Sequence, residues 1–191
     1  MAGRPRSFDR DAALAAAVEQ FWRQGYEGTS IATLTSVMGV SPPSLYAAFG
    51  DKQHLFEEAS AEYFRRTCEG LDQAAALPTA REAVVRVLED TARAHTDAST
   101  PPGCMMLTEP LLTAQREELQ QRLLDRLDRG VEDGDLPAGT RTDRLASYLV
   151  TVLRGMSGRA RDGGTLEDLR QIAEIAMTAF PAGMKDAGDR P

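Results

Sequence analysis

The residues best suited to chemistry lie between positions 29 and 52, and most of them are hydrogen-bond donors. Ser41, Ser44 and Tyr46 carry hydroxyl groups, and Lys52 carries an ammonium group. Ser41, Ser44 and Lys52 fall near the expected start of a helix, where backbone N–H groups also lack partners. Donors in this arrangement bind the oxygens of phosphate groups. The pattern therefore favours recognition of a nucleic acid backbone.

Catalysis has little support in the sequence. The two histidines, His54 and His95, are far apart in the chain, and no Ser/His/Asp or Cys/His spacing accompanies them. No glycine-rich phosphate loop and no cluster of metal-ligating residues stands out. We therefore expect a protein that is not an enzyme and that has no catalytic residue, metal site or cofactor.

Residues 29–49 have the pattern of a helix-turn-helix. Two short helices can pack through a small apolar core made of Leu34, Met38, Val40, Leu45 and Phe49. Gly39 permits the tight turn between them. The opposite face of the second helix must be free to enter the major groove of DNA. Small side chains on that face would let the backbone approach the bases closely, and they are Pro42, Pro43, Ser44, Ala47 and Ala48.

Helices must position these residues, and the composition favours helices throughout. Ala, Leu, Arg and Glu dominate, and strand-like alternation is nearly absent, so we expect an all-α fold. Capping signals and apolar stripes predict nine helices, at about 9–24, 30–38, 41–49, 51–72, 79–97, 104–110, 115–132, 142–157 and 166–180.

These helices predict two domains and a tail. The first three form an N-terminal head, residues 1–50, and the helix over 51–73 connects it to the rest. Residues 51–181 form a body of about six helices. Residues 182–191 are small and polar, and we expect them to be disordered.

The head also resembles a known family. Residues 21–30 (FWRQGYEGTS), 39–41 (GVS) and 44–52 (SLYAAFGDK) look like the DNA-binding head of the TetR family of transcriptional regulators. The similarity covers roughly residues 8–60, and the rest of the chain matches only in length and helix count. The resemblance implies a homodimeric, ligand-responsive repressor that binds a palindromic operator in double-stranded DNA.

The resemblance implies roles for individual head residues. Pro42, Pro43 and Ser44 would meet base edges or the nearby DNA backbone, and Tyr46 and Lys52 would each contact a phosphate. Thr29 or Ser30 would offer a hydroxyl and a helix N-terminus to a further phosphate. The expected DNA-binding set is completed by Thr33 and Ser41.

The sequence departs from the family pattern at four positions. Ala32 and Thr33 replace a charged pair that is often found early in the first helix of the motif. Ala47 and Ala48 replace bulkier or polar groups late in the second. We therefore expect contacts with thymine methyl groups, and DNA shape, to carry more of the specificity.

The charge distribution is compatible with DNA as a partner. The net charge is −7, yet residues 1–55 carry equal numbers of cations and anions. The excess negative charge therefore lies in the body, where it would confine DNA contact to the head. Arg4 and Arg6 precede the first helix, and they form either an arm for the minor groove or merely a solubilising start.

The last two predicted helices have the pattern of an interface. Each carries an apolar stripe that a monomer would bury in its own core, with further apolar residues beside it. The resemblance favours a four-helix dimer interface here, since two recognition helices need a fixed spacing. The expected interface residues are Tyr148, Val152, Gly155, Ile172, Ile175 and Phe180.

An effector pocket is expected among the helices of the body. Methionine adapts to irregular ligands, which favours a small, largely apolar effector whose identity the sequence does not give. The expected lining residues are Phe64, Cys104, Met105, Met106, Leu112 and Met156. Each of them would also suit an ordinary core.

Two other functions remain open. Cys104 is expected at a helix N-terminus, where thiolates are stabilised, so the repressor could instead sense oxidants or electrophiles; a buried core residue is the simpler interpretation. The alternative of another class is a helical interaction module without DNA binding.

The cellular setting is predicted to be the cytoplasm. Cys68 and Cys104 do not make a disulfide framework, so we expect free thiols. A membrane-spanning helix needs about 18 consecutive apolar residues, and no stretch of the sequence approaches that length. We therefore expect no membrane partner.

Overall fold

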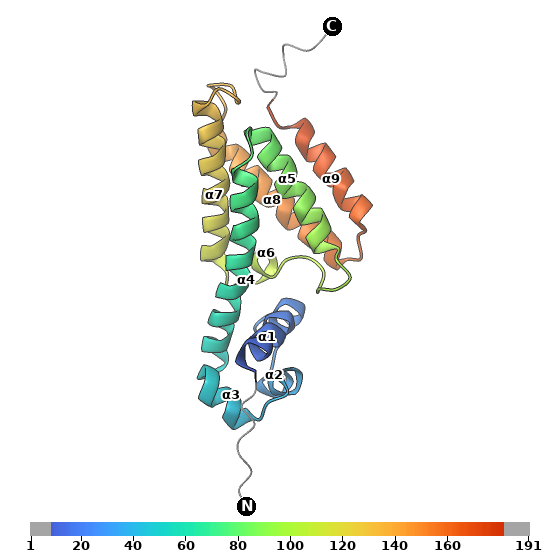
Figure 1. Ribbon diagram of the computed structural model, residues 1–191. Helices are drawn as coiled ribbons and strands as arrows, with labels where there is room; N and C mark the ends of the chain where they lie inside the picture. The colour runs from blue at the N-terminus through green and yellow to red at the C-terminus, as the bar shows by residue number, and fades with distance from the viewer. Residues whose placement is uncertain (1–8, 182–191) are drawn as a thin grey trace, which may run out of the picture. The chain divides into compact units, whose positions relative to one another are not determined.

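The computed structural model describes residues 9–181, and within them the chain is helical without any strand, as predicted. The helices are α1 (Arg10–Gln24), α2 (Ile31–Met38), α3 (Pro42–Phe49), α4 (Lys52–Ala75), α5 (Ala80–His95), α6 (Met105–Thr108), α7 (Thr113–Glu132), α8 (Thr142–Arg161) and α9 (Leu166–Thr178), as labelled in Figure 1. Internal contacts divide the chain into two units, residues 1–64 and residues 65–191. Helix α4 contributes to both.

Local sequence signals set the ends of the two helix-turn-helix elements. Ser30 Oγ accepts a hydrogen bond from the Thr33 amide (3.0 Å), and Ser41 Oγ accepts one from the Ser44 amide (3.3 Å). These caps satisfy amides that the helices themselves leave without partners. Gly39 ends α2 with a φ of 66°, in the left-handed region that glycine adopts without strain. The turn into α3 depends on that conformation.

The first unit is held together by aromatic side chains of α1 and the first part of α4. The Phe21 ring meets the Phe56 ring edge to face at 5.1 Å between centroids, and Tyr26 meets Phe56 at 5.0 Å. Leu34 and Leu45 are fully buried beside them, and α2 packs against both α1 and α3. The first part of the connecting helix α4 therefore packs into the core of the first unit, which extends to residue 64.

The second unit forms its own core. Helix α7 packs on α8, the short α6 packs on α7 and α8, and α5 packs on α8 and α9 (Figure 1). Leu127, Leu136, Met156 and Leu169 are among its most deeply buried side chains. This core keeps α5 and α7 in a fixed arrangement.

The helix ends agree with the sequence signals to within two residues, except that α4 continues to Ala75, past the expected end at residue 72, and α8 is also longer than expected. Helix α8 continues past the expected end at Ser157 to Arg161, because Gly158 is tolerated inside the helix and Ala160 is buried against the core. Gly163, with a φ of 85°, supplies the turn that follows. Helix α9 ends at Thr178, just before the expected end at Phe180.

Candidate nucleic-acid interface

The outward face of α3 is not covered by the rest of the head. Pro42, Pro43 and Ala47 are exposed, and Tyr46 keeps 49% of its surface accessible. The inward face carries Leu45, which is fully buried. Helix α3 is thus short and two-sided, with small side chains outside, and a helix of this kind can approach base edges closely.

Hydroxyl groups cluster at the starts of α2 and α3. Ser30 and Thr33 share a hydrogen bond of 2.8 Å between their hydroxyl groups, and Ser41 and Ser44 share one of 2.9 Å. Ser30 and Ser41 are exposed, while Thr33 and Ser44 are half-buried. The first amides of a helix and the positive end of its dipole attract anions. Each of these two helix starts can therefore receive a phosphate oxygen.

Lys52 brings an ammonium group to the start of α4. Its Nζ lies 4.0 Å from the centre of the Tyr26 ring, in a cation–π contact that restrains the side chain. Beside it, Asp51 Oδ1 accepts a hydrogen bond from the His54 amide (2.9 Å), which lowers the pKa of the Asp51 carboxyl. Because this helix start already holds a carboxylate, Lys52 is the group here that can bind a phosphate.

One described member of the predicted DNA-binding set, Thr29, stands apart from this surface. Thr29 keeps only 1% of its area exposed, and its Oγ1 donates to the Gly25 carbonyl (2.7 Å). A buried hydroxyl with that bond cannot reach a phosphate, so of these two residues only Ser30 presents its hydroxyl at the surface. Arg4 and Arg6 lie outside the described residues.

Arg10 fixes the end of α3, although the sequence does not single it out. Its guanidinium donates two hydrogen bonds to Glu58 (2.5 and 2.7 Å) and one to the Ala48 carbonyl (3.3 Å). It also lies 4.4 Å from the centre of the Phe49 ring. Helices α1, α3 and α4 therefore meet at one side chain. A charged residue in the first turn of a helix is ordinarily solvated, so only the structure identifies this role.

The predicted dimer residues lie on and just after α8 and α9. Five of them are exposed or half-buried: Tyr148, Val152, Gly155, Ile172 and Ile175. Ile175 keeps 69% of its surface accessible, which is unusual for a large apolar residue. Phe180 differs from the prediction, because it is buried within its own unit and offers no surface to a second subunit.

Most of the predicted effector residues are buried, and they lie outside the cavity among α4, α5 and α7. Five of them are buried: Cys104, Met105, Met106, Leu112 and Met156. Phe64 is half-buried on α4. None of the six lines the cavity that lies among α4, α5 and α7. Their apolar pattern is common to cores and pockets, and close packing decides between the two.

Sequence comparison gives the family of the chain. Residues 13–59 match the family model described as bacterial regulatory proteins, tetR family. The chain is 34% identical to the HTH-type transcriptional repressor ComR of Escherichia coli (strain K12), over 96% of this chain and 94% of that protein. The chain belongs to the TetR family. It is also 30% identical to the HTH-type transcriptional repressor BdcR of the same organism, over 93% and 92% of the two chains.

Structural comparison agrees with this assignment. The fold is similar to that of the TetR family transcriptional regulator CifR, in a cysteine mutant complexed with 26-bp double-strand operator DNA. The TM-score is 0.89, with 41% identity over 93% of this chain and 100% of that one. The predicted family and the predicted helical fold are thereby confirmed. Within residues 9–181, none of the helices combines the length and apolar character that crossing a membrane requires.

Proposed function

We propose that this TetR-family protein is a dimeric transcriptional repressor, which binds a palindromic operator through α3 and releases it when a small effector binds the body. The observation that carries the proposal is the exposed outer face of α3, flanked by the hydroxyl-bearing starts of α2 and α3 and by Lys52. The repressors ComR and BdcR and the operator complex of CifR support it.

The head residues divide between reading bases and holding phosphates. Ser44 brings a hydroxyl to the reading face, while Pro43 and Ala47 offer apolar contact to thymine methyl groups. Ser30 and Tyr46 would hold phosphates, and their contacts position the helix without carrying sequence information. With so few polar groups on α3, DNA shape would supply a large share of the specificity.

Two-fold symmetry would come from α8 and α9. Tyr148 and Ile175 are large apolar or aromatic residues left exposed by the single chain, and Val152 and Ile172 are half-buried beside the same helices. Apolar residues that gather on one surface mark sites of association. An isologous pairing of these helices would set the spacing of two recognition helices on successive major grooves.

Selection from random duplex DNA at low salt tests the proposal. The purified protein should enrich an inverted repeat, and Ser44→Ala should change the base preference at symmetrical positions of the motif. Ser99→Ala, the same change in an exposed turn of the second unit, should leave the motif unaltered. If no motif is enriched, the chain is a helical interaction module and not an operator-binding repressor.

A further inference from the structure

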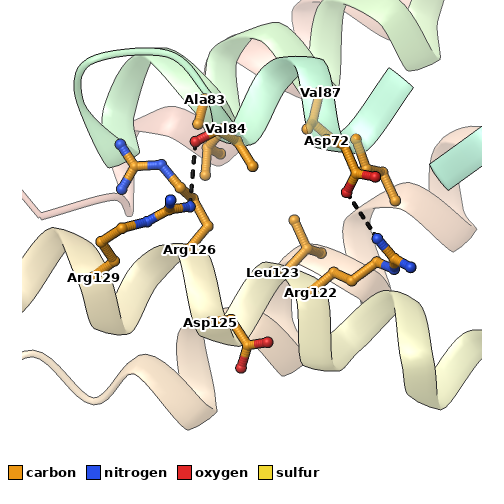
Figure 2. Close-up of a pocket in the computed structure, with 11 residues that line it drawn as sticks. Asp72, Ala83, Val84, Val87, Arg122, Leu123, Asp125, Arg126 and Arg129 are labelled. Atoms are coloured by element: carbon orange, nitrogen blue, oxygen red, sulfur yellow. Dashed lines mark hydrogen bonds and ion pairs between the residues drawn. The ribbon is translucent and has the colours of Figure 1, made fainter. Parts of the chain in front are cut away.

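The cavity among α4, α5 and α7 has walls of two kinds. Its volume is about 200 Å³, and all of its lining residues belong to the second unit. The apolar part includes Val84, Val87 and Leu123, which face one another in Figure 2. The polar part is a row of three arginines on one face of α7, namely Arg122, Arg126 and Arg129. Apolar walls with a few convergent polar groups are typical of ligand sites.

Arg126 is the most unusual residue of this cavity. Its side chain is only 5% exposed, and Nη2 donates to the Leu77 carbonyl (3.2 Å) and lies 3.7 Å from an Asp135 carboxylate oxygen. Within the described residues, its Nε and Nη1 are buried without any hydrogen-bond partner. The Oδ1 of its ion-pair partner Asp135 is also buried without a hydrogen-bond partner in this part of the chain. Buried guanidinium donors are ordinarily satisfied, so Asp135 balances the charge of Arg126 but leaves two of its donors without an acceptor.

The other two arginines differ in how far the protein satisfies them. Arg122 is engaged by Asp72 (2.7 Å) and Glu118 (2.9 Å), so its charge is already balanced. Arg129 is exposed at the cavity and makes one hydrogen bond, to the Ala75 carbonyl (3.3 Å), with no carboxylate partner among the described residues. Positive charge is therefore available at Arg129, beside the unsatisfied donors of Arg126.

The Asp135 carboxylate that pairs with Arg126 is not among the residues that line the cavity, and the two acidic residues that do line it are engaged elsewhere. Asp72 is held by Arg122, as Figure 2 shows. Asp125 also borders the cavity, but its carboxylate is turned away from the other labelled side chains in Figure 2 and accepts a hydrogen bond from Gln121 (2.7 Å). The groups left to meet a ligand are thus apolar side chains and arginine donors.

From this arrangement we propose that the cavity binds a short-chain organic carboxylate. The carboxylate faces Arg126 and Arg129, and the hydrocarbon chain lies against Val84, Val87 and Leu123. Charge-assisted hydrogen bonds from arginine are among the strongest that a carboxylate can accept. A volume of about 200 Å³ is below the about 300–1,000 Å³ of typical pockets for drug-sized ligands, which favours a small effector.

This inference deepens the proposed function, because the carboxylate would be the effector, and its regulatory role rests on that proposal. It also replaces the largely apolar effector expected from the sequence with an amphipathic anion.

Isothermal titration of the full chain without DNA tests the site directly. Hexanoate is the probe, and hexanamide is its neutral control of the same shape. Hexanoate should bind, and hexanamide should bind at least about tenfold more weakly, since one charge-assisted interaction is lost. Acids with two to eight carbons would define the chain length that the cavity accepts.

Two pairs of variants locate the binding. Arg129→Gln should weaken hexanoate binding about tenfold, whereas Arg86→Gln, at an exposed arginine of α5 outside the cavity, should not change it. Val87→Phe should abolish binding by filling the cavity, whereas Val85→Phe, on the same helix but outside the cavity, should not. Arg129 and Val85 are exposed, so their variants should fold normally.

The results separate the site from the repressor role. The carboxylate site would be overturned if hexanoate and hexanamide bound with equal affinity, or if Arg129→Gln and Val87→Phe both left hexanoate binding unchanged. It would also be overturned if no acid bound with a Kd below about 10 mM. Operator release is measured separately by fluorescence anisotropy. Carboxylate binding with undisturbed operator binding would refute the effector role, while failure to bind any operator would refute the proposed function and leave the site standing.

Discussion

Tyr46→Phe isolates one contact between α3 and the DNA backbone. The Tyr46 ring stays in place, and only the hydroxyl is removed. A hydrogen bond to a charged group contributes about 1.5–3 kcal/mol. Because Tyr46 is 49% exposed, water can replace part of the lost interaction, and we take the lower end of that range. Two protomers then lose about 3 kcal/mol together, which weakens operator binding about 100-fold.

Fluorescence anisotropy with a labelled operator measures this loss at fixed ionic strength. Binding to unrelated duplex DNA should weaken in proportion, because phosphate contacts carry no sequence information. The melting temperature should not change, since the structure shows no hydrogen bond from the Tyr46 hydroxyl among the described residues. Ser99→Ala, which removes a hydroxyl from an exposed turn of the second unit, is the control, and it should leave operator affinity within about twofold of wild type.

Operator binding by Tyr46→Phe within about twofold of wild type, at the same salt concentration, would refute the phosphate contact of Tyr46. That result would mean that the outer face of α3 is not oriented toward the phosphates as proposed. A loss confined to the operator, with unrelated DNA unaffected, would instead assign Tyr46 to base reading.

Three further perturbations test other parts of the molecule. Lys52→Gln should reduce the slope of log affinity against log salt by about 0.9 per protomer, measured by anisotropy over a salt series. Ile175→Asp should give monomers in analytical ultracentrifugation and abolish operator binding, whereas Val85→Asp, exposed on α5, should remain dimeric. Burial, and to a lesser extent the charge of Arg161, lowers the pKa of His95 from 6.5 to about 4. His95 therefore binds a proton more readily in the unfolded chain, so the free energy of unfolding should fall by about 2 kcal/mol between pH 7 and pH 5, as measured by urea denaturation. His95→Gln should remove this loss, and the control His54→Gln should retain it.

Local signals made the head predictable from the sequence. The caps at Ser30 and Ser41 and the glycine at Gly39 each act within a few residues of the chain, so their spacing is visible without knowledge of the fold. The same holds for Thr79 and Glu82, which form the capping box that begins α5. The exposed face of α3 follows from these boundaries, because Leu45 and Phe49 can be buried on one side only.

Features that depend on distant partners were not predictable in this way. Arg10 meets Glu58 across 48 positions, and Arg126 meets Asp135 only because α7 and the following turn bring them together. The spacing of Arg122, Arg126 and Arg129, at steps of four and three, does place them on one helix face. That signal could have suggested a basic row on α7. It could not have shown which of these guanidinium groups lacks a partner, since that depends on tertiary packing.

The burial of Cys104 bears on how the repressor would be induced. Cys104 is the N-cap residue of α6, as expected, but its thiol makes no capping hydrogen bond. Helix α6 has only four residues, so little dipole is available to stabilise a thiolate. Cys104 keeps 4% of its area exposed, and its amide donates to the buried Ser157 hydroxyl (2.8 Å). An oxidant would reach the sulfur only after α6 separated from α8, which would also unpack Met105 and Met106. A ligand in the arginine-lined cavity requires no such opening. We therefore favour induction by a ligand, and linkage then requires the operator to weaken carboxylate binding by the same factor as the carboxylate weakens operator binding.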